Sequence, residues 1–315
     1  MKLLLTIVLL VLGMQIHAQK KETYYDYNWK PCDPLLARFY SINEKTDSGW
    51  FRRDYYIGEL KLQMAALYSD EANKVHNGYS YYFYPDGKLS ETGQKIQNKK
   101  EGLFFSFHNN GMMKDSGFFH DDKLVGKRFG WHPNGAQSDS IVAVNDSMEI
   151  HVSWFDNGVP SSAGYTKYGK DHGKWRYFHN NGKPAALEVY NQGKLVSGEY
   201  FDEDGVVQTK PFKDEIPASF KGGMDGWRTY LEKNLYWPHD LHFKDGNMAV
   251  TGIEMTISED GNVENVFVTT PFHPEFDNIA LKVIKQSPKW KPAIQNNRRV
   301  KYRFRQHVTF QEPDE

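Results

Sequence analysis

Histidines are the residues whose spacing in this sequence comes closest to a chemical pattern. His108, His132 and His179 recur at one position of a repeated unit, and a sheet would bring His108 near His132. Imidazole nitrogens bind transition metals and transfer protons near neutral pH. A recurring surface position explains the three side chains without any such chemistry. We therefore expect no metal site from them.

Other residue types that carry chemistry also lack their partners. His239 and His242 lie three residues apart with no third ligand nearby, as a zinc site would need. The Gly222-Gly223 pair is not followed by the lysine and hydroxyl residue of a phosphate-binding loop. Cys32 is the only cysteine, so it forms no internal disulfide, and no histidine partner is evident for it. The sequence predicts no catalytic residue, no metal and no cofactor, and hence a non-enzymatic protein.

Composition narrows the classes of partner and of fold. Lys+Arg number 39 and Asp+Glu 40, so no basic field is present to hold a nucleic acid. Aromatic residues make up 15% of the chain and glycines number 26, which favours strands and tight turns. With 315 residues, the chain is long enough for two domains with separate cores.

The first 19 residues have the layout of an export signal. Lys2 precedes the apolar stretch 3–16, and Ala18 stands just before a strongly polar segment. Fourteen residues of helix span roughly 21 Å, less than the ~30 Å of a bilayer core. We expect a cleaved signal peptide over 1–19 and a periplasmic protein. The alternative is an uncleaved segment that anchors the chain in the inner membrane, facing the periplasm.

A repeat of about 24 residues dominates the centre of the chain. Glycines that close predicted hairpin turns follow Asn or Asp and are spaced by 24, 24, 23, 24 and 23 residues. An aromatic residue stands four positions before each glycine. We expect these aromatics to form a continuous apolar ridge along stacked hairpins. The glycines are Gly87, Gly111, Gly135, Gly158, Gly182 and Gly205, and the aromatics are Phe83, Phe107, Trp131, Trp154, Phe178 and Phe201.

These units, of which 102–111 is typical, resemble MORN repeats of the longer bacterial kind. The resemblance covers residues 76–208, about six units, and implies an elongated antiparallel β-sheet. It implies no single activity, because one fold supports many functions. The less regular segment 20–75 contains strand-like patterns, and we interpret it as a β capping region of the same sheet.

The pattern changes after a linker predicted over 209–219. Residues 220–312 predict a helix, two strands that turn at Asp260-Gly261, an amphipathic helix starting at Phe276, and a last strand over 300–310. Together with Trp237-Pro238 and the segment 290–293, this order resembles a TonB C-terminal domain. The family usually has Tyr where Trp237 stands. The expected fold class is therefore mainly β, a MORN-type hairpin sheet followed by a small α+β domain.

The TonB resemblance implies recognition by β-augmentation, in which an extended peptide pairs with an exposed sheet edge. The last strand is the best candidate edge, and its basic outer face discourages indiscriminate pairing. Trp237 and Pro238 either contact the partner or fix the exit of the first helix. The predicted partner-binding residues are Trp237, Pro238, Val300, Tyr302, Phe304, Gln306, Val308 and Phe310.

Two functions remain open from the sequence. The first is a TonB-family envelope protein that binds an outer-membrane receptor or another envelope protein, linked to TonB-dependent transport. The second is a MORN-repeat scaffold or antitoxin-like binding protein with no energy-transducing role. The partner, any transported ligand and the oligomeric state are not indicated by the sequence.

Overall fold

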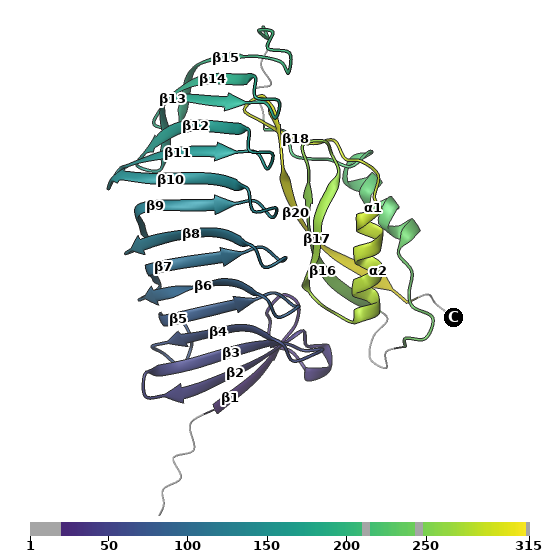
Figure 1. Cartoon of the computed structure of the whole chain (residues 1–315). Helices are drawn as coiled ribbons and strands as arrows, with labels where there is room; N and C mark the ends of the chain where they lie inside the picture. Colours follow the sequence, from purple (N-terminus) through teal and green to yellow (C-terminus); the bar gives the residue numbers. More distant parts are fainter. Residues whose placement is uncertain (1–19, 210–214, 243–247, 313–315) are drawn as a thin grey trace, which may run out of the picture.

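The computed structural model describes residues 20–209, 215–242 and 248–312. The predicted signal peptide 1–19 and part of the predicted linker lie outside the described residues. One long antiparallel sheet is followed by a small α+β region, which confirms the predicted fold class (Figure 1). No helix in the described ranges combines the length and the apolar character needed to cross a membrane.

The long sheet is a ladder of 15 strands in which each strand pairs only with its neighbours in the sequence (Figure 1). Consecutive hairpins give this order, because each turn returns the chain beside the strand it has just left. A short 3-10 helix, η1 (Pro34–Leu36), interrupts the first hairpin. The strands are β1 (Lys20–Tyr25), β2 (Phe39–Thr46), β3 (Gly49–Tyr56), β4 (Leu62–Tyr68), β5 (His76–Phe83), β6 (Leu89–Ile96), β7 (Lys99–Phe107), β8 (Met113–His120), β9 (Lys123–Trp131), β10 (Gln137–Asn145), β11 (Met148–Trp154), β12 (Pro160–Lys167), β13 (Lys170–Phe178), β14 (Pro184–Asn191) and β15 (Lys194–Tyr200).

The two ends of the hairpins use different turns. At the predicted glycine turns only the glycine has positive φ, for example 87° at Gly111, and its N–H donates to the carbonyl of His108. This is a type I turn closed by a glycine bulge, not the two-residue turn with two left-handed residues. Most of the opposite turns do have two such residues, as at Asp121 and Asp122, but the β10–β11 turn at Asp146-Ser147 has none. The bulge at the glycine end shifts the pairing register, as between Ser106 and Phe107 of β7.

The recurring histidines tie successive hairpins together at the glycine turns. His108 Nε2 lies 2.7 Å from the carbonyl oxygen of Trp131, and His132 Nε2 lies 2.9 Å from that of Trp154. His179 makes the same contact with Phe201 at 3.0 Å. Each acceptor is the backbone carbonyl of the predicted column aromatic in the next repeat. The histidines therefore have a structural role between repeats.

Asparagines form a second row of the same kind. The Nδ2 of Asn134 donates to the carbonyl of Asp156 at 2.9 Å, while its Oδ1 accepts from the Ala136 N–H at 3.0 Å. Asn110 and Asn181 repeat both bonds in their own turns. Each asparagine closes its own turn and binds the next one. The six column aromatics beside these turns are half-buried, and their continuity as a ridge stays a prediction.

Within the sheet, large aromatics lie over glycines of the neighbouring strand. A Cβ added at Gly93 would stand 2.3 Å from the ring of Phe104, and one at Gly164 would stand 2.1 Å from the ring of Trp175. Both rings are buried although they belong to a single sheet. The missing side chains at these glycines allow a one-layer array to bury part of its own core.

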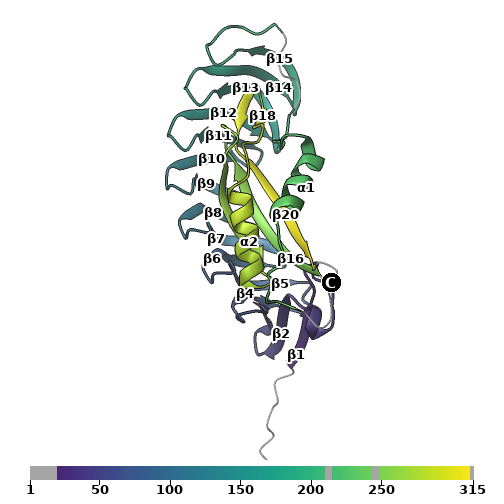
Figure 2. The same cartoon turned by 90° about the vertical axis from the view of Figure 1, so that its right-hand side faces the viewer.

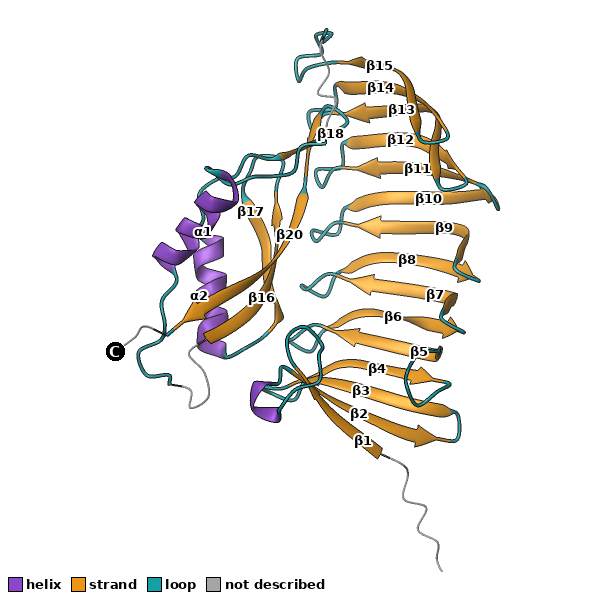
Figure 3. Cartoon of the chain, turned by 180° about the vertical axis from the view of Figure 1, so that it is seen from behind, coloured by secondary structure: helices purple, strands orange, loops and turns teal. Residues whose placement is uncertain are grey.

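The C-terminal region has a three-stranded sheet in the order β17-β16-β20 with both helices on one side (Figure 3). Its elements are α1 (Gly223–Asn234), β16 (Met248–Ile257), β17 (Val263–Thr270), α2 (Pro274–Lys285), β18 (Ala293–Gln295), β19 (Arg298–Val300) and β20 (Tyr302–Gln311). The α2 residues Phe276, Ala280 and Ile284 are almost fully buried, as the amphipathic pattern predicts. Val300 was expected in the last strand, but this was wrong. It pairs with Ala293 in the β18–β19 hairpin, and β20 begins at Tyr302.

The other side of this small sheet faces the long array. In Figure 2 the array turns lie behind β16, β17 and β20, and the helices lie in front. Nearly every residue of β16 is buried, including the polar Thr251 and Glu254. Burial of alternate residues on both faces requires a cover on both faces. The helices supply one cover and the array supplies the other.

Candidate functional site

Strand β20 has one hydrogen-bonded side and one free side. It pairs with β16 through ten consecutive residues, from Tyr302 opposite Ile257 to Gln311 opposite Met248. No described residue pairs with its other side. Backbone N–H and C=O groups along that side are therefore available to a further strand.

Side chains of β20 alternate between core and surface. Val308 and Phe310 are buried, whereas Arg303, Arg305 and His307 are exposed on the opposite face. This arrangement matches the predicted alternation. Packing of the core-facing side chains holds the strand in place. The backbone groups on its free side take no part in that packing.

A buried carboxylate holds two of these basic residues. Glu254 of β16 accepts bonds from Arg303 Nε and Nη2 at 2.5 and 2.6 Å, and from Arg305 Nε at 2.5 Å. Burial alone would raise the pKa of Glu254, but these bonds hold that pKa below its usual value. The ion cluster keeps both guanidinium groups on the array-facing side of the strand.

A groove of about 640 Å³ lies beside the free edge, between β20 and α1. Buried Trp227 and Leu231 of α1 form its floor together with Phe310, and Trp227 Nε1 donates to the Gln306 side chain across it. Exposed Met224 and Tyr236 stand at its rim. A strand added to β20 would thus have an apolar channel for every second side chain.

The rim of the groove carries charges of both signs. Arg228 pairs with Asp225 at 2.7 Å, both exposed, and Glu232 and His307 also line the opening. Mixed charge at an apolar groove favours orientation of a partner more than affinity.

The predicted site residues divide into four groups. Trp237, Gln306 and Phe310 line the groove. Trp237 is nonetheless held by the core, because its Nε1 donates to the Leu241 carbonyl at 2.6 Å and its ring meets Phe276 edge-on. Buried Pro238 lies beside the groove without lining it, while Tyr302, Phe304 and Val308 pack into the domain core and Val300 belongs to β19.

Sequence reasoning missed the α1 wall of the groove. Met224 and Arg228 of α1, and Tyr236 just after it, lie outside the apolar pattern that located the helix. The only sequence signal for these positions is an apolar Met and a Tyr among polar neighbours. Single exposed residues of this kind are common on protein surfaces, so they do not identify a binding site.

The array clamps the C-terminal domain at one end through the turn of the β18–β19 hairpin. Asn297 Nδ2 donates to the carbonyls of Ala185 and Phe201 at 2.9 and 2.7 Å. Arg298 Nη1 donates to the Ser161 carbonyl at 2.8 Å, and its guanidinium lies 5.3 Å from the centre of the Tyr177 ring. Burial lowers the pKa of Arg298 to about 10, so the group stays charged at neutral pH.

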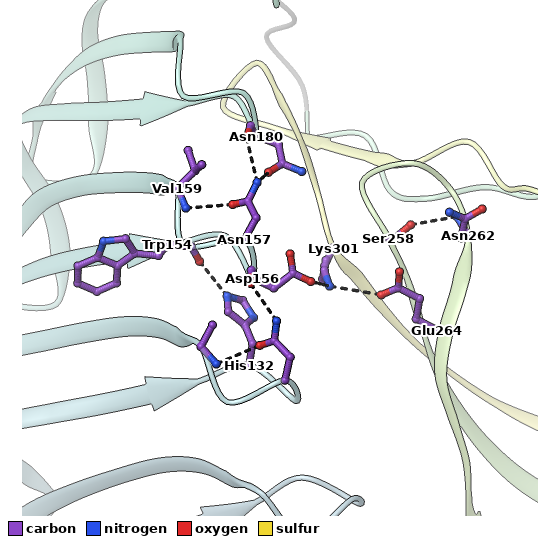
Figure 4. Close-up of polar contacts among 12 residues, drawn as sticks. His132, Trp154, Asp156, Asn157, Val159, Asn180, Ser258, Asn262, Glu264 and Lys301 are labelled. Carbon is purple, nitrogen blue, oxygen red and sulfur yellow. Dashed lines mark hydrogen bonds and ion pairs between the residues drawn. The ribbon is translucent and has the colours of Figure 1, made fainter.

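An ion pair follows directly after this hairpin (Figure 4). Lys301 Nζ lies 2.6 Å from Asp156 of an array turn and 3.3 Å from Glu264 of β17. Burial opposes both charges, yet their hydrogen bond lowers the pKa of Asp156 and raises that of Lys301. The lysine therefore bridges the two parts of the chain.

Aromatic contacts complete the clamp at the other end. Tyr84 meets Phe267 of β17 edge-on at 5.5 Å, and Arg38 lies 4.2 Å from the centre of the Phe272 ring. Tyr27 contacts His307 of β20 at 5.3 Å. The array thus covers one face of the small sheet at both ends, while the free edge of β20 and its groove lie on the flank.

The residues first considered for chemistry have other surroundings. Burial raises the pKa of the Cys32 thiol, and the Asp26 carboxylate adds to this effect. His242 pairs with Glu312 at 2.6 Å. Within the described ranges, no three His, Cys, Asp or Glu side chains come together as metal ligands.

Comparison with protein families supports the two resemblances. Residues 243–311 match the model of the Gram-negative bacterial TonB protein C-terminal family, and residues 171–192 match the MORN repeat variant family. No curated protein matches the chain. The predicted TonB-type domain and MORN-type repeat are therefore confirmed for these two segments.

Proposed function

We propose that this chain, which its TonB-type C-terminal domain marks as a cell-envelope protein, binds other proteins and has no enzymatic activity. An extended segment of an outer-membrane receptor or another envelope protein adds as a fourth strand beside β20. The observation that carries the proposal is the free backbone side of β20 next to the α1 groove. Main-chain hydrogen bonds supply affinity, and the groove selects alternate side chains.

The groove indicates the kind of peptide that fits. Its floor of Trp227, Leu231 and Phe310 suits apolar side chains at every second position. The intervening side chains would point toward the array-facing side, near Arg305 and His307. An extended peptide with apolar and acidic or polar residues in alternation therefore matches both sides of the edge.

The N-terminal sequence supports a periplasmic location. The basic start and apolar stretch of 1–19 fit an export signal, and a retained signal would instead anchor the chain in the inner membrane. In either form the docking edge acts in the periplasm, and we propose that it serves TonB-dependent transport. The clamped array gives β20 a fixed orientation, in place of a flexible spacer.

A second candidate function is a scaffold or antitoxin-like role of the array. The observation in its favour is a set of exposed apolar side chains on the array strands, including Tyr79, Leu103, Phe118 and Val125. Exposed apolar groups that recur along a sheet are suited to binding another protein.

A matched pair of charge substitutions distinguishes the two functions. Met224→Glu places a charge at the rim of the groove, and Val125→Glu places one on the array, both at exposed positions. Pull-down from an outer-membrane extract with the whole chain should lose its specific partner only with Met224→Glu. Loss with Val125→Glu alone would favour the scaffold and overturn the docking proposal.

A further inference from the structure

Strand β15, the last strand of the array, also has a free edge. Strand β15 pairs with β14 and with no other named strand. After Tyr200 the chain turns at 202–205, and of the residues that the structure describes only Val207 and Gln208 return beside β15. Val207 bridges Phe201, and the Gln208 N–H donates to the Tyr200 carbonyl. Residues 194–199 of β15 have no pairing partner on their outer side among the described residues.

This edge exposes more apolar side-chain surface than the edge at the other end of the array. Strand β1 carries Lys20, Lys21 and Glu22, with an ion pair of 2.5 Å between Lys20 and Glu22. On β15, Leu195 and Val196 are 48% and 65% exposed. Charges are a usual means of keeping edge strands from pairing, and exposed apolar residues on an edge promote pairing. The β15 edge therefore has the features of a contact surface.

The charges at the two ends of β15 fit a second copy of the same strand. Glu199 lies opposite Leu187 of β14, and Lys194 lies opposite Asn191. Leu187 and Asn191 are four residues apart and so share a face of β14. The bulge between Ser197 and Leu195 thus places Lys194 and Glu199 on one face of β15, although they are five residues apart. Neither forms an ion pair with a described residue.

We propose that two copies of this chain associate through β15, antiparallel, about a twofold axis normal to the sheet between Val196 and Ser197. This axis brings Lys194 of each copy opposite Glu199 of the other and places Leu195 and Val196 at the centre. The contact is isologous, so it closes at two copies and does not extend into a filament. Both β20 grooves remain free, and the dimer presents two of them.

Charge reversal tests the proposal on the full-length protein, with mass measured by light scattering or sedimentation over a concentration series. Lys194→Glu places two glutamates opposite each other twice, and Glu199→Lys does the same with lysines. Each single variant should weaken the dimer by roughly tenfold or more. The double reversal K194E/E199K restores both pairs and should dimerise as the original chain does.

Mixing the two single variants provides a second test of the proposal. The two single variants, each of which dimerises weakly alone, should form a tighter heterodimer when combined, because every facing pair is then Glu opposite Lys. Lys174→Glu, an exposed charge reversal within β13, is the matched control and should leave the dimer intact. A chain that is monomeric throughout the series, or single variants that dimerise undiminished, would overturn the proposal.

Discussion

Arg298 Nη1 lies 2.8 Å from the carbonyl oxygen of Ser161, a residue 137 positions earlier in the chain. This bond, with those of Asn297, fixes the β18–β19 hairpin against the array strands β12 to β15. Because β20 follows the hairpin after Lys301, the array also sets the position of the docking edge. The repeat region and the C-terminal domain act as one structural unit.

The Arg298 contact should contribute measurably to stability. Arg298→Ala leaves the Ser161 carbonyl without its donor in a buried place, which costs about 1–3 kcal/mol. The expected result is a lower midpoint of chemical unfolding and faster hydrogen exchange around 293–300. Arg299→Ala is the control, since its pair with Glu203 is solvent-exposed and is worth about 0–1 kcal/mol. Equal effects of the two substitutions would show that the hairpin is not held by Arg298.

Two substitutions at Asn134 distinguish the two hydrogen bonds that each asparagine of the row makes. Asn134→Ala removes both the donor to Asp156 and the acceptor for Ala136, and we expect it to cost about 1–2 kcal/mol in unfolding free energy. Asn134→Asp keeps the acceptor but loses the donor, so its cost should be smaller. If the two variants unfold alike, the bond within the turn, from the Ala136 N–H to Asn134 Oδ1, contributes nothing.

Array stability should fall in mild acid because of His76. Burial, and then Lys95, lower the pKa of His76 to about 4, from an ordinary 6.5. The unfolded chain therefore takes up a proton that the folded chain resists, and stability present above pH 6.5 is lost as the pH falls toward 4. His76→Phe, which keeps a ring beside Tyr68, should flatten this part of the curve of unfolding free energy against pH. An unchanged slope between pH 6.5 and 4 would contradict this assignment.

Patterns within single units made much of the fold predictable. The turn glycines such as Gly111, and the amphipathic spacing from Phe276 to Ile284, depend on contacts a few residues apart. The recurrence of His108 and His132 was also visible in the sequence, but their acceptors are backbone carbonyls of the next repeat, which carry no sequence signal.

Contacts between distant segments were not predictable in this way. The Asn296-Asn297 pair before Arg298 indicates a tight turn, yet nothing in it names Ser161 or Ala185 as the surface it meets. The same holds for the α1 wall of the groove, which becomes a wall only because β20 packs beside it. Val300 was misassigned because the hairpin and β20 form one nearly continuous run of strand-like residues.

Site-specific photocrosslinking in cells tests docking at β20 most directly. A photoreactive residue at Thr309, exposed on β20 and lining the groove, is compared with one at Val125 on the array. Docking by strand addition predicts an adduct from position 309, mapped by mass spectrometry to an extended segment of an envelope protein and lost with Met224→Glu. Adducts from position 125 with none from position 309 would contradict it.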